Sequence, residues 1–283
     1  MDKVAIVTDS TSYLPKSLRE QYNIHMVPLN VIFENESYQE EKEISAEEFY
    51  QQVREGGKLP KTSQPAVGLF SELYESLAKE GYTDVIVITL SSEISGTYQS
   101  AMSASTMVEG INVHVFDSEI SCMPQGFFVL EAAKMAEQGQ AAKLILSRLT
   151  VIRAQGISAY FMVDDLSHLH RGGRLNSAQF FVGNLLQVKP VLHFVNKKIV
   201  PFEKIRTRKK AIKRLFDLVK EDVDREDEVT ISVIHANREE EAKEYAEQLK
   251  ELYPNAEVII SYFGPVIGTH LGEGSIGLTW IKE

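Results

Sequence analysis

Short apolar runs rich in β-branched residues alternate with helical patterns through the first part of the chain. The runs cover residues 4–8, 26–33, 85–90, 113–116 and 157–163. Short strands that are apolar on both faces and separated by helices are typical of a parallel sheet with helical crossovers. We therefore expect an α/β domain with a parallel sheet in this part of the sequence.

Capping residues indicate where several helices begin. Ser45 and Glu48 form a Ser-x-x-Glu capping box, and Gly56 with Gly57 is placed to end the helix that follows. Pro65 is placed to open another helix, whose apolar residues recur at helical spacing. Helices at residues 127–135 and 180–188 carry aromatic and aliphatic side chains suited to a core or to an apolar tunnel.

The pattern changes after about residue 165. Residues 189–195 and 198–202 predict a hairpin around Asn196-Lys197, and a helix is expected from Thr207. Further strands are predicted at residues 228–235, 256–262 and 276–281, with a helix at 238–253. We predict two α/β domains, residues 1–165 with a parallel sheet and residues 166–283 with a mixed sheet. The C-terminal loop could contact the first domain.

Composition narrows the class of protein. A chain of 283 residues is long enough for two domains, and its net charge of -10 argues against nucleic-acid binding. A single cysteine, Cys122, excludes a disulfide framework within the chain. The N-terminus lacks the pattern of a signal peptide, and no apolar run approaches the ~20 residues that a membrane-spanning helix needs. We expect a cytoplasmic protein without stable membrane insertion.

Hydroxyl-bearing loops are the main chemical signal. Ser95 follows a predicted strand and precedes a predicted helix, and Thr62-Ser63 precedes the helix that Pro65 opens. Ligands of open α/β sheets lie beyond the carboxyl ends of the strands, and helix N-termini favour anions. Ser95 could equally serve only as a helix cap. The charge of Asp9, in a third such loop, would repel an anion, so we assign Asp9 a structural role.

A glycine-rich C-terminal segment, residues 264–274, surrounds His270. Four glycines and a proline indicate a backbone bent to a particular shape. His270 could be a neutral hydrogen-bond donor, an imidazolium partner for a carboxylate, or a solvated loop residue.

Other catalytic and metal sites fit the sequence less well. The chain has no phosphate-binding loop, no dinucleotide-binding glycine motif and no Gly-x-Ser-x-Gly elbow. A metal cluster can be drawn from His168, His170, Asp164 and Asp165, but a helix end with charged neighbours explains these residues better. We predict neither a metal ion nor a cofactor.

One basic cluster interrupts this acidic sequence, largely in the first turns of the helix expected from Thr207. Its members are Lys204, Arg206, Arg208, Lys209, Lys210, Lys213 and Arg214. Cations at a helix N-terminus are unfavourable by roughly 0.3–1 kcal/mol each when exposed. The cluster is either a solvated face or a docking surface for an acidic or phosphorylated partner.

The ordered set of motifs closely resembles the DegV family over essentially the whole chain. The motifs are Thr8-Asp9-Ser10-Thr11-Ser12, Thr62-Ser63-Gln64-Pro65, Ser92-Glu93-Ile94-Ser95-Gly96-Thr97-Tyr98, Arg171-Gly172-Gly173-Arg174 and Gly264-Pro265-x-x-Gly-x-His270. The resemblance implies a bacterial two-domain α/β protein that binds a long-chain fatty acid between its domains. In the family's fatty-acid kinase system, such a protein presents the acyl carboxylate to a separate ATP-dependent kinase, and the acyl-phosphate enters phospholipid synthesis.

The resemblance also assigns residue roles. Thr62 and Ser95 match the hydroxyls that bind the carboxylate, His270 matches the histidine near the head group, and Arg206 matches a position that engages the kinase. The chain departs from the family at Glu273, where relatives often have proline, and at the bulky segment that includes Cys122 and Pro124.

The resemblance therefore implies a lipid-binding, non-catalytic kinase subunit whose bound ligand is a long-chain fatty acid. An alternative is a serine hydrolase or acyl transferase that acts on lipid carboxyl derivatives through Ser95 and His270. A third hypothesis is a regulatory module that senses acyl chains.

Overall fold

The computed structural model describes residues 3–34, 36–56, 59–175 and 188–282. Contacts between residues divide the chain into two compact units, each built from two segments. Unit 1 comprises Met1–Asn30 and Thr62–Gly156, and unit 2 comprises Val31–Lys61 and Ile157–Glu283.

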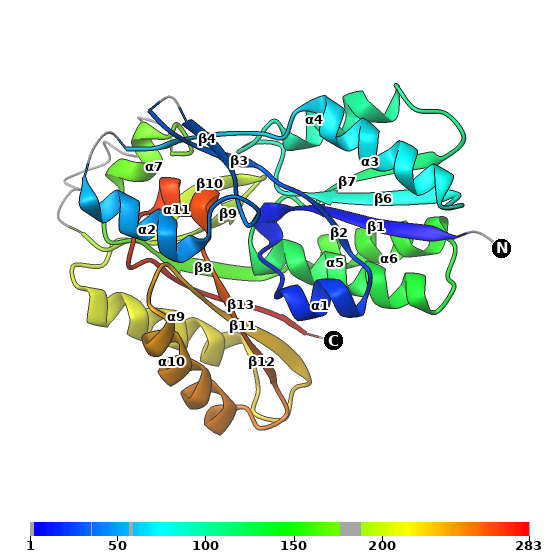
Figure 1. Ribbon diagram of the computed structural model, residues 1–283. Helices are drawn as coiled ribbons and strands as arrows, with labels where there is room; N and C mark the ends of the chain where they lie inside the picture. The colour runs from blue at the N-terminus through cyan, green and yellow to red at the C-terminus, as the bar shows by residue number, and fades with distance from the viewer. Residues whose placement is uncertain (1–2, 35, 57–58, 176–187, 283) are drawn as a thin grey trace. The chain divides into compact units, whose positions relative to one another are not determined.

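Unit 1 contains a four-stranded sheet of order β2-β1-β6-β7 in which every pair is parallel. Its strands are β1 (Val4–Asp9), β2 (His25–Val27), β6 (Asp84–Thr89) and β7 (Asn112–Asp117). Its helices are α1 (Lys16–Gln21), α3 (Val67–Lys79), α4 (Thr97–Ser105), α5 (Met123–Glu137) and α6 (Ala142–Gln155), with a short 3-10 turn at Ser10–Ser12. Helices α3 and α4 cover one face of the sheet, and α1, α5 and α6 cover the other (Figure 1).

Both faces of the unit 1 sheet are buried, which explains the continuous apolar runs in its strands. Every residue of β6 is buried. Val7 and Val87, which are aligned in β1 and β6, pack with Phe70 and Tyr74 of α3 in one apolar cluster. Phe127 and Phe128 of α5 are buried as well. The other predicted apolar helix, residues 180–188, lies almost entirely outside the described residues.

Unit 2 contains a six-stranded mixed sheet of order β10-β9-β8-β13-β11-β12. Its strands are β8 (Ser158–Met162), β9 (Val191–Val195), β10 (Lys198–Glu203), β11 (Val229–His235), β12 (Glu257–Tyr262) and β13 (Ile276–Lys282). Among these, β11 and β12 are parallel and the other neighbours are antiparallel. Its helices include α7 (Ser167–Arg171), α9 (Arg208–Asp222), α10 (Glu239–Leu252) and α11 (Pro265–Leu271). The fold class predicted from the sequence is confirmed: one unit has a parallel sheet and the other a mixed sheet.

The segment from Val31 to Lys61 clusters with unit 2, whereas the sequence pattern groups it with the N-terminal domain. It carries β3 (Asn30–Phe33), β4 (Glu36–Gln39) and α2 (Ala46–Glu55), and it ends within β5 (Lys61–Ser63). Strands β4, β3 and β5 form a third sheet. The second break in the contacts falls after Gly156 rather than at residue 165. Hydrogen bonds to partners more than 200 residues away, such as Tyr50 to Phe263, explain why local sequence does not show this division.

Within the described residues, no helix is both long enough and apolar enough to cross a lipid bilayer.

Candidate ligand-binding site

Polar loops follow the carboxyl ends of β1, β6 and β7 in unit 1. Backbone hydrogen bonds join these loops, from Ser91 N to the Ile120 carbonyl (2.7 Å) and from Cys122 N to the Thr11 carbonyl (3.0 Å). The edge of the sheet at which ligands of parallel α/β proteins bind is therefore one connected layer of hydroxyl-bearing loops.

Asp9 is the centre of this layer. Its fully buried carboxylate accepts hydrogen bonds from Thr11 N (2.9 Å), Thr11 Oγ1 (2.6 Å), Leu90 N (2.8 Å) and Gln125 Nε2 (3.2 Å). Burial raises the pKa of Asp9, and these hydrogen bonds act in the opposite direction. Asp9 thus ties the first two loops and α5 together, which agrees with a structural role.

Thr62 and Ser95 belong to adjoining segments of unit 1, and both are half-buried. Ser95 Oγ lies 2.9 Å from Thr97 Oγ1 and accepts a hydrogen bond from Thr97 N (3.3 Å), whereas the N-cap position of α4 is occupied by Gly96. A Cβ atom added at Gly96 would lie 2.7 Å from Nε2 of Gln64, so the segment after Thr62 touches the segment after Ser95. The two hydroxyl-bearing segments that the sequence singled out are therefore neighbours.

His270 lies in unit 2 on α11, where its side chain is only 8% exposed. Burial, together with the charges of Arg174 and His168, lowers the pKa of His270 to about 3. The imidazole is therefore neutral at pH 7. Of the roles that the sequence left open for His270, the low pKa favours a neutral hydrogen-bonding group over a permanently charged imidazolium.

Arg174 is a site residue to which the sequence assigned no role. Its half-buried guanidinium donates a hydrogen bond to the carbonyl of Gly172 (2.5 Å), the residue that packs against the His270 ring. The charge of Arg174 lowers the pKa of His270, and burial lowers the pKa of Arg174 as well. A desolvated cation near a neutral imidazole attracts an anion. The signal in the sequence was the Arg171-Gly172-Gly173-Arg174 motif. Gly172 is required there because an added Cβ would collide with Nδ1 of His270.

Residues 31–61 hold α11 in place from within unit 2. The buried Glu40 carboxylate accepts a hydrogen bond from Val266 N (2.9 Å) in the first turn of α11, and the Tyr50 hydroxyl donates to the Phe263 carbonyl (2.7 Å). A Cβ atom at Gly268 would lie 2.5 Å from the Tyr50 hydroxyl oxygen. The helix that carries His270 is thus fixed at its N-terminus and along one side.

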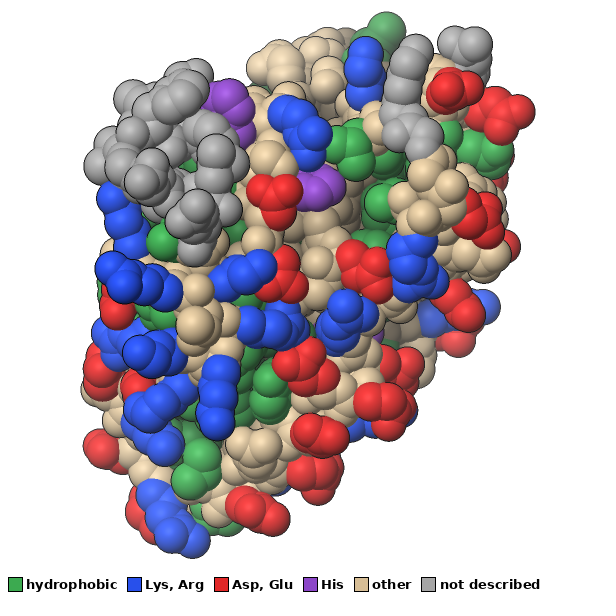
Figure 2. Space-filling view, turned by 90° about the vertical axis from the view of Figure 1, so that its left-hand side faces the viewer, with side chains coloured by type: hydrophobic (Ala, Val, Ile, Leu, Met, Phe, Trp, Pro, Cys, Tyr) green, Lys and Arg blue, Asp and Glu red, His purple; other side chains and the backbone are tan. Residues whose placement is uncertain are grey.

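The basic cluster divides into paired and exposed cations. Arg208 is half-buried and contacts Asp164 (3.0 Å) and Glu241 (2.8 Å), and Arg214 pairs with Glu203 (2.8 Å). Exposed members include Arg206, immediately before Thr207, whose hydroxyl caps α9 by accepting a hydrogen bond from Lys210 N (3.4 Å). Figure 2 shows Lys and Arg side chains gathered over the lower left of the face it presents. Arg206 therefore belongs to a surface, whereas Arg208 is part of the framework.

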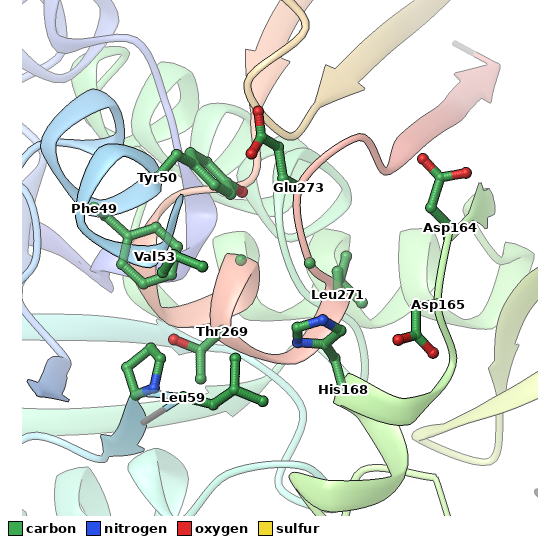
Figure 3. Close-up of a pocket in the computed structure, with 13 residues that line it drawn as sticks. Phe49, Tyr50, Val53, Leu59, Asp164, Asp165, His168, Thr269, Leu271 and Glu273 are labelled. Carbon is green, nitrogen blue, oxygen red and sulfur yellow. The ribbon is translucent and has the colours of Figure 1, made fainter. Parts of the chain in front are cut away.

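A cavity of about 210 Å³ lies beside α11 in unit 2. Phe49 and Tyr50 of α2 line it on one side of α11, and His168 lines it on the other (Figure 3). Pockets that enclose drug-sized ligands typically measure about 300–1,000 Å³, and this cavity lies below that range. His270 is not among its lining residues.

Glu273 also lines this cavity. Its carboxylate accepts hydrogen bonds from Arg54 (3.0 Å), Asn237 (2.9 Å) and Arg238 (3.1 Å). Glu273 therefore links α2 to the segment before α10. Among the described residues, no group of three or more His, Cys, Asp or Glu side chains is arranged to hold a metal ion.

Comparison with known proteins establishes the family. A sequence profile described as "Uncharacterised protein, DegV family" matches residues 3–283. The chain belongs to the DegV family. Protein DegV of Bacillus subtilis is 54% identical over 277 residues, which is 98% of each sequence.

Solved structures of DegV proteins share the whole fold. The crystal structure of DegV from Bacillus subtilis, described as a fatty acid binding protein, has a TM-score of 0.94 at 53% identity and covers 100% of both chains. A DegV family protein from Thermus thermophilus, described by its fatty acid binding, has a TM-score of 0.90 at 31% identity and covers 99% of this chain and 100% of that one. The family and the two-domain α/β architecture predicted from the sequence are thus confirmed.

Proposed function

We propose that this protein binds a long-chain fatty acid and presents its carboxylate to a separate ATP-dependent kinase, which forms an acyl-phosphate for phospholipid synthesis. The observation that carries the lipid-binding part is the likeness, over the entire chain, to a DegV protein described as a fatty acid binding protein. The kinase role rests on the family resemblance and on the exposed basic surface that includes Arg206.

The proposed head-group donors are the hydroxyls of Thr62 and Ser95 and the imidazole of His270. A carboxylate that leaves water needs hydrogen-bond donors to offset its lost hydration. Charge-assisted bonds to neutral donors provide them without a permanent ion pair. Arg174, near His270, adds a favourable positive potential. Such a site holds the carboxylate and leaves it nucleophilic toward a phosphoryl group.

The acyl chain supplies most of the binding energy. A sixteen-carbon acid buries about 14 methylenes at about 0.8 kcal/mol each, roughly 11 kcal/mol before the costs of association. That is sufficient to retain a fatty acid without a covalent bond.

The alternative, a serine hydrolase that uses Ser95 with His270 as its base, has less support. A general base works best when its pKa lies near the operating pH. Burial and neighbouring positive charge lower the pKa of His270 to about 3, so its neutral ring accepts a proton poorly at pH 7.

The experiment that tests the proposed function measures acyl-phosphate formation from palmitate, Mg-ATP and the host's purified kinase. We expect turnover that requires both proteins and that falls at least tenfold in Ser95→Ala, because one carboxylate donor is lost. Ser105→Ala, which changes a half-buried serine in the same unit, is the matched control. Ester hydrolysis without ATP or kinase, abolished by Ser95→Ala, would establish the hydrolase instead.

A further inference from the structure

A row of aromatic rings crosses four neighbouring strands of unit 2. Tyr160 of β8 stacks on Trp280 of β13 and on His193 of β9, with 5.7 Å between ring centroids in each pair. Phe202 of β10 meets both Tyr160 and His193 edge-on at 5.0 Å. The buried end of the row is fixed, because the Trp280 indole donates a hydrogen bond to Asp222 (2.6 Å).

The row runs from the interior to the surface. Trp280 is 2% exposed, whereas Phe202, at the other end, is 39% exposed. Phe202 is also held from the helix side, since the Arg214 guanidinium lies 5.9 Å from its ring centroid. A large apolar ring that is both exposed and fixed in place loses little conformational freedom when a partner covers it, which is the property of an interface anchor.

Positive charge lies close to this ring along the chain, because Arg206 follows Phe202 by four residues and Lys210 precedes Arg214, which contacts the ring, by one helical turn. Residues 189–214 contain ten Lys and Arg residues and a single Glu, a net charge of +9 in a chain of net charge -10. Arg206, Lys209 and Lys210 are exposed and have no ion-pair partner among the described residues. Their placement at the start of α9 is unfavourable for the isolated helix, so an external acidic partner is the simplest account of it.

The edge of the sheet argues against a second copy of the chain as that partner. Strand β10, on which Phe202 lies, is one of the two outer strands of this sheet. It contains Pro201, and its register with β9 shifts between Pro201 and Glu203. Proline and irregular register on an edge strand block pairing with another strand. Like charges on two copies would also repel each other.

We propose that Phe202 is the apolar anchor of a docking surface whose cations are Arg206, Lys209 and Lys210, and that the surface fits an acidic protein face with an apolar recess. This inference rests on the proposed function, in which that partner is the fatty acid kinase. The cations steer association and the ring supplies the affinity that salt does not screen.

The test is the dissociation constant of the fatty-acid-loaded protein and the host's kinase at 50 and 300 mM salt. We expect Phe202→Ala to weaken binding at least tenfold at both salt concentrations, with the salt dependence unchanged. We expect Arg206→Glu to weaken binding mainly at low salt and to flatten the salt dependence. Leu252→Ala on α10 removes a side chain of nearly equal exposure, 38%, and should change binding by less than twofold.

Phe202→Leu keeps an apolar side chain and should recover most of the binding, which separates loss of the anchor from loss of folding. If the folded Phe202→Ala variant and the wild type had the same dissociation constant for the kinase, this inference would be overturned and the kinase role would stand. Wild type that does not bind kinase at either salt concentration would overturn the kinase role and this inference together. Phe202-dependent binding to phosphatidylglycerol vesicles, with kinase binding unaffected by Phe202→Ala, would assign the surface to membranes and refute the proposal.

Discussion

At the scale of single residues, the environment of His270 dictates its chemistry. Burial and the positive charge of Arg174 hold the ring neutral, so it can hydrogen-bond a carboxylate but carries no charge at pH 7. The position of His270 depends on two glycines. Gly172 leaves room for the His270 ring, and Gly268, on the same helix as His270, leaves room for the side chain of Tyr50.

The low pKa of His270 makes folding stability depend on pH. Its folded-state value of about 3 lies below the ordinary 6.5, so its contribution is complete above pH 6.5 and is lost as the pH falls toward 3. His270→Asn removes this titration. We expect the free energy of unfolding of wild type, relative to the variant, to fall by about 1.4 kcal/mol per pH unit between pH 6 and 4.

Urea titrations at several pH values measure this difference in the free energy of unfolding. The contributions of the other buried histidines cancel in the difference because both proteins contain them. Leu252→Ala serves as a control that should run parallel to wild type. If the His270→Asn curve also ran parallel to wild type, the ring would not be the desolvated group described above.

A second residue-scale prediction compares two glycines. Gly172→Ala places a methyl group against the His270 ring, with Cε1 only 2.9 Å away, and should destabilise the protein by about 1–3 kcal/mol. Gly68→Ala, within α3 and with no atom within 4 Å of the added carbon, should instead stabilise by about 0.5–1 kcal/mol. Thermal melts distinguish the two, and equal shifts would refute the proposed contact with His270.

At the scale of elements, local signals identified most strands and helices but not their tertiary partners. The capping box at Ser45 forms as predicted, with Ser45 and Glu48 each accepting from the other's backbone N–H. The predicted hairpin is also confirmed, with Asn196 and Lys197 at positive φ in its turn. These features depend on residues close together in sequence, so the pattern alone is sufficient.

Features that depend on distant residues were missed. Residues 264–274 were expected to be a loop, yet they contain α11, whose first turn is capped by Glu40 from 226 residues earlier. The assignment of residues 31–61 to unit 2 and the closeness of Arg174 to His270 arise in the same way. A single sequence without its tertiary contacts does not reveal them.

Glu40 allows the role of residues 31–61 to be tested. Glu40→Ala leaves the buried N–H of Val266 without its acceptor and should cost about 1–3 kcal/mol of stability. Glu40→Gln retains an acceptor oxygen and should cost less. Exposed Glu75 on α3 provides the control, and its replacement by Ala should have little effect on a urea titration. Equal losses in Glu40→Ala and Glu75→Ala would show that Glu40 does not hold α11.

At the scale of the whole molecule, the proposed hydroxyl donors and the basic surface belong to different units of the chain. Thr62 and Ser95 belong to unit 1, whereas His270, Arg174 and the basic surface at the start of α9 belong to unit 2. An acidic chain that places ten of its 30 Lys and Arg residues in one stretch, which also contains an exposed aromatic ring, is suited to an acidic partner. The head-group donors that we propose are neutral, so we expect lipid retention and partner binding to be separable by mutation.

The central claim is that this chain retains a fatty acid through Thr62 and Ser95. The most direct test is mass spectrometry of organic extracts from the purified, never-denatured protein, compared with Thr62→Ala/Ser95→Ala protein prepared in the same way. Ser147→Ala/Thr150→Ala, which removes two exposed hydroxyls from α6 in the same unit, is the matched control.

We predict one free fatty acid per wild-type and control molecule and a large loss in the Thr62/Ser95 variant, with all three proteins folded. Wild-type protein that carries no fatty acid and does not take up added palmitate would contradict the account.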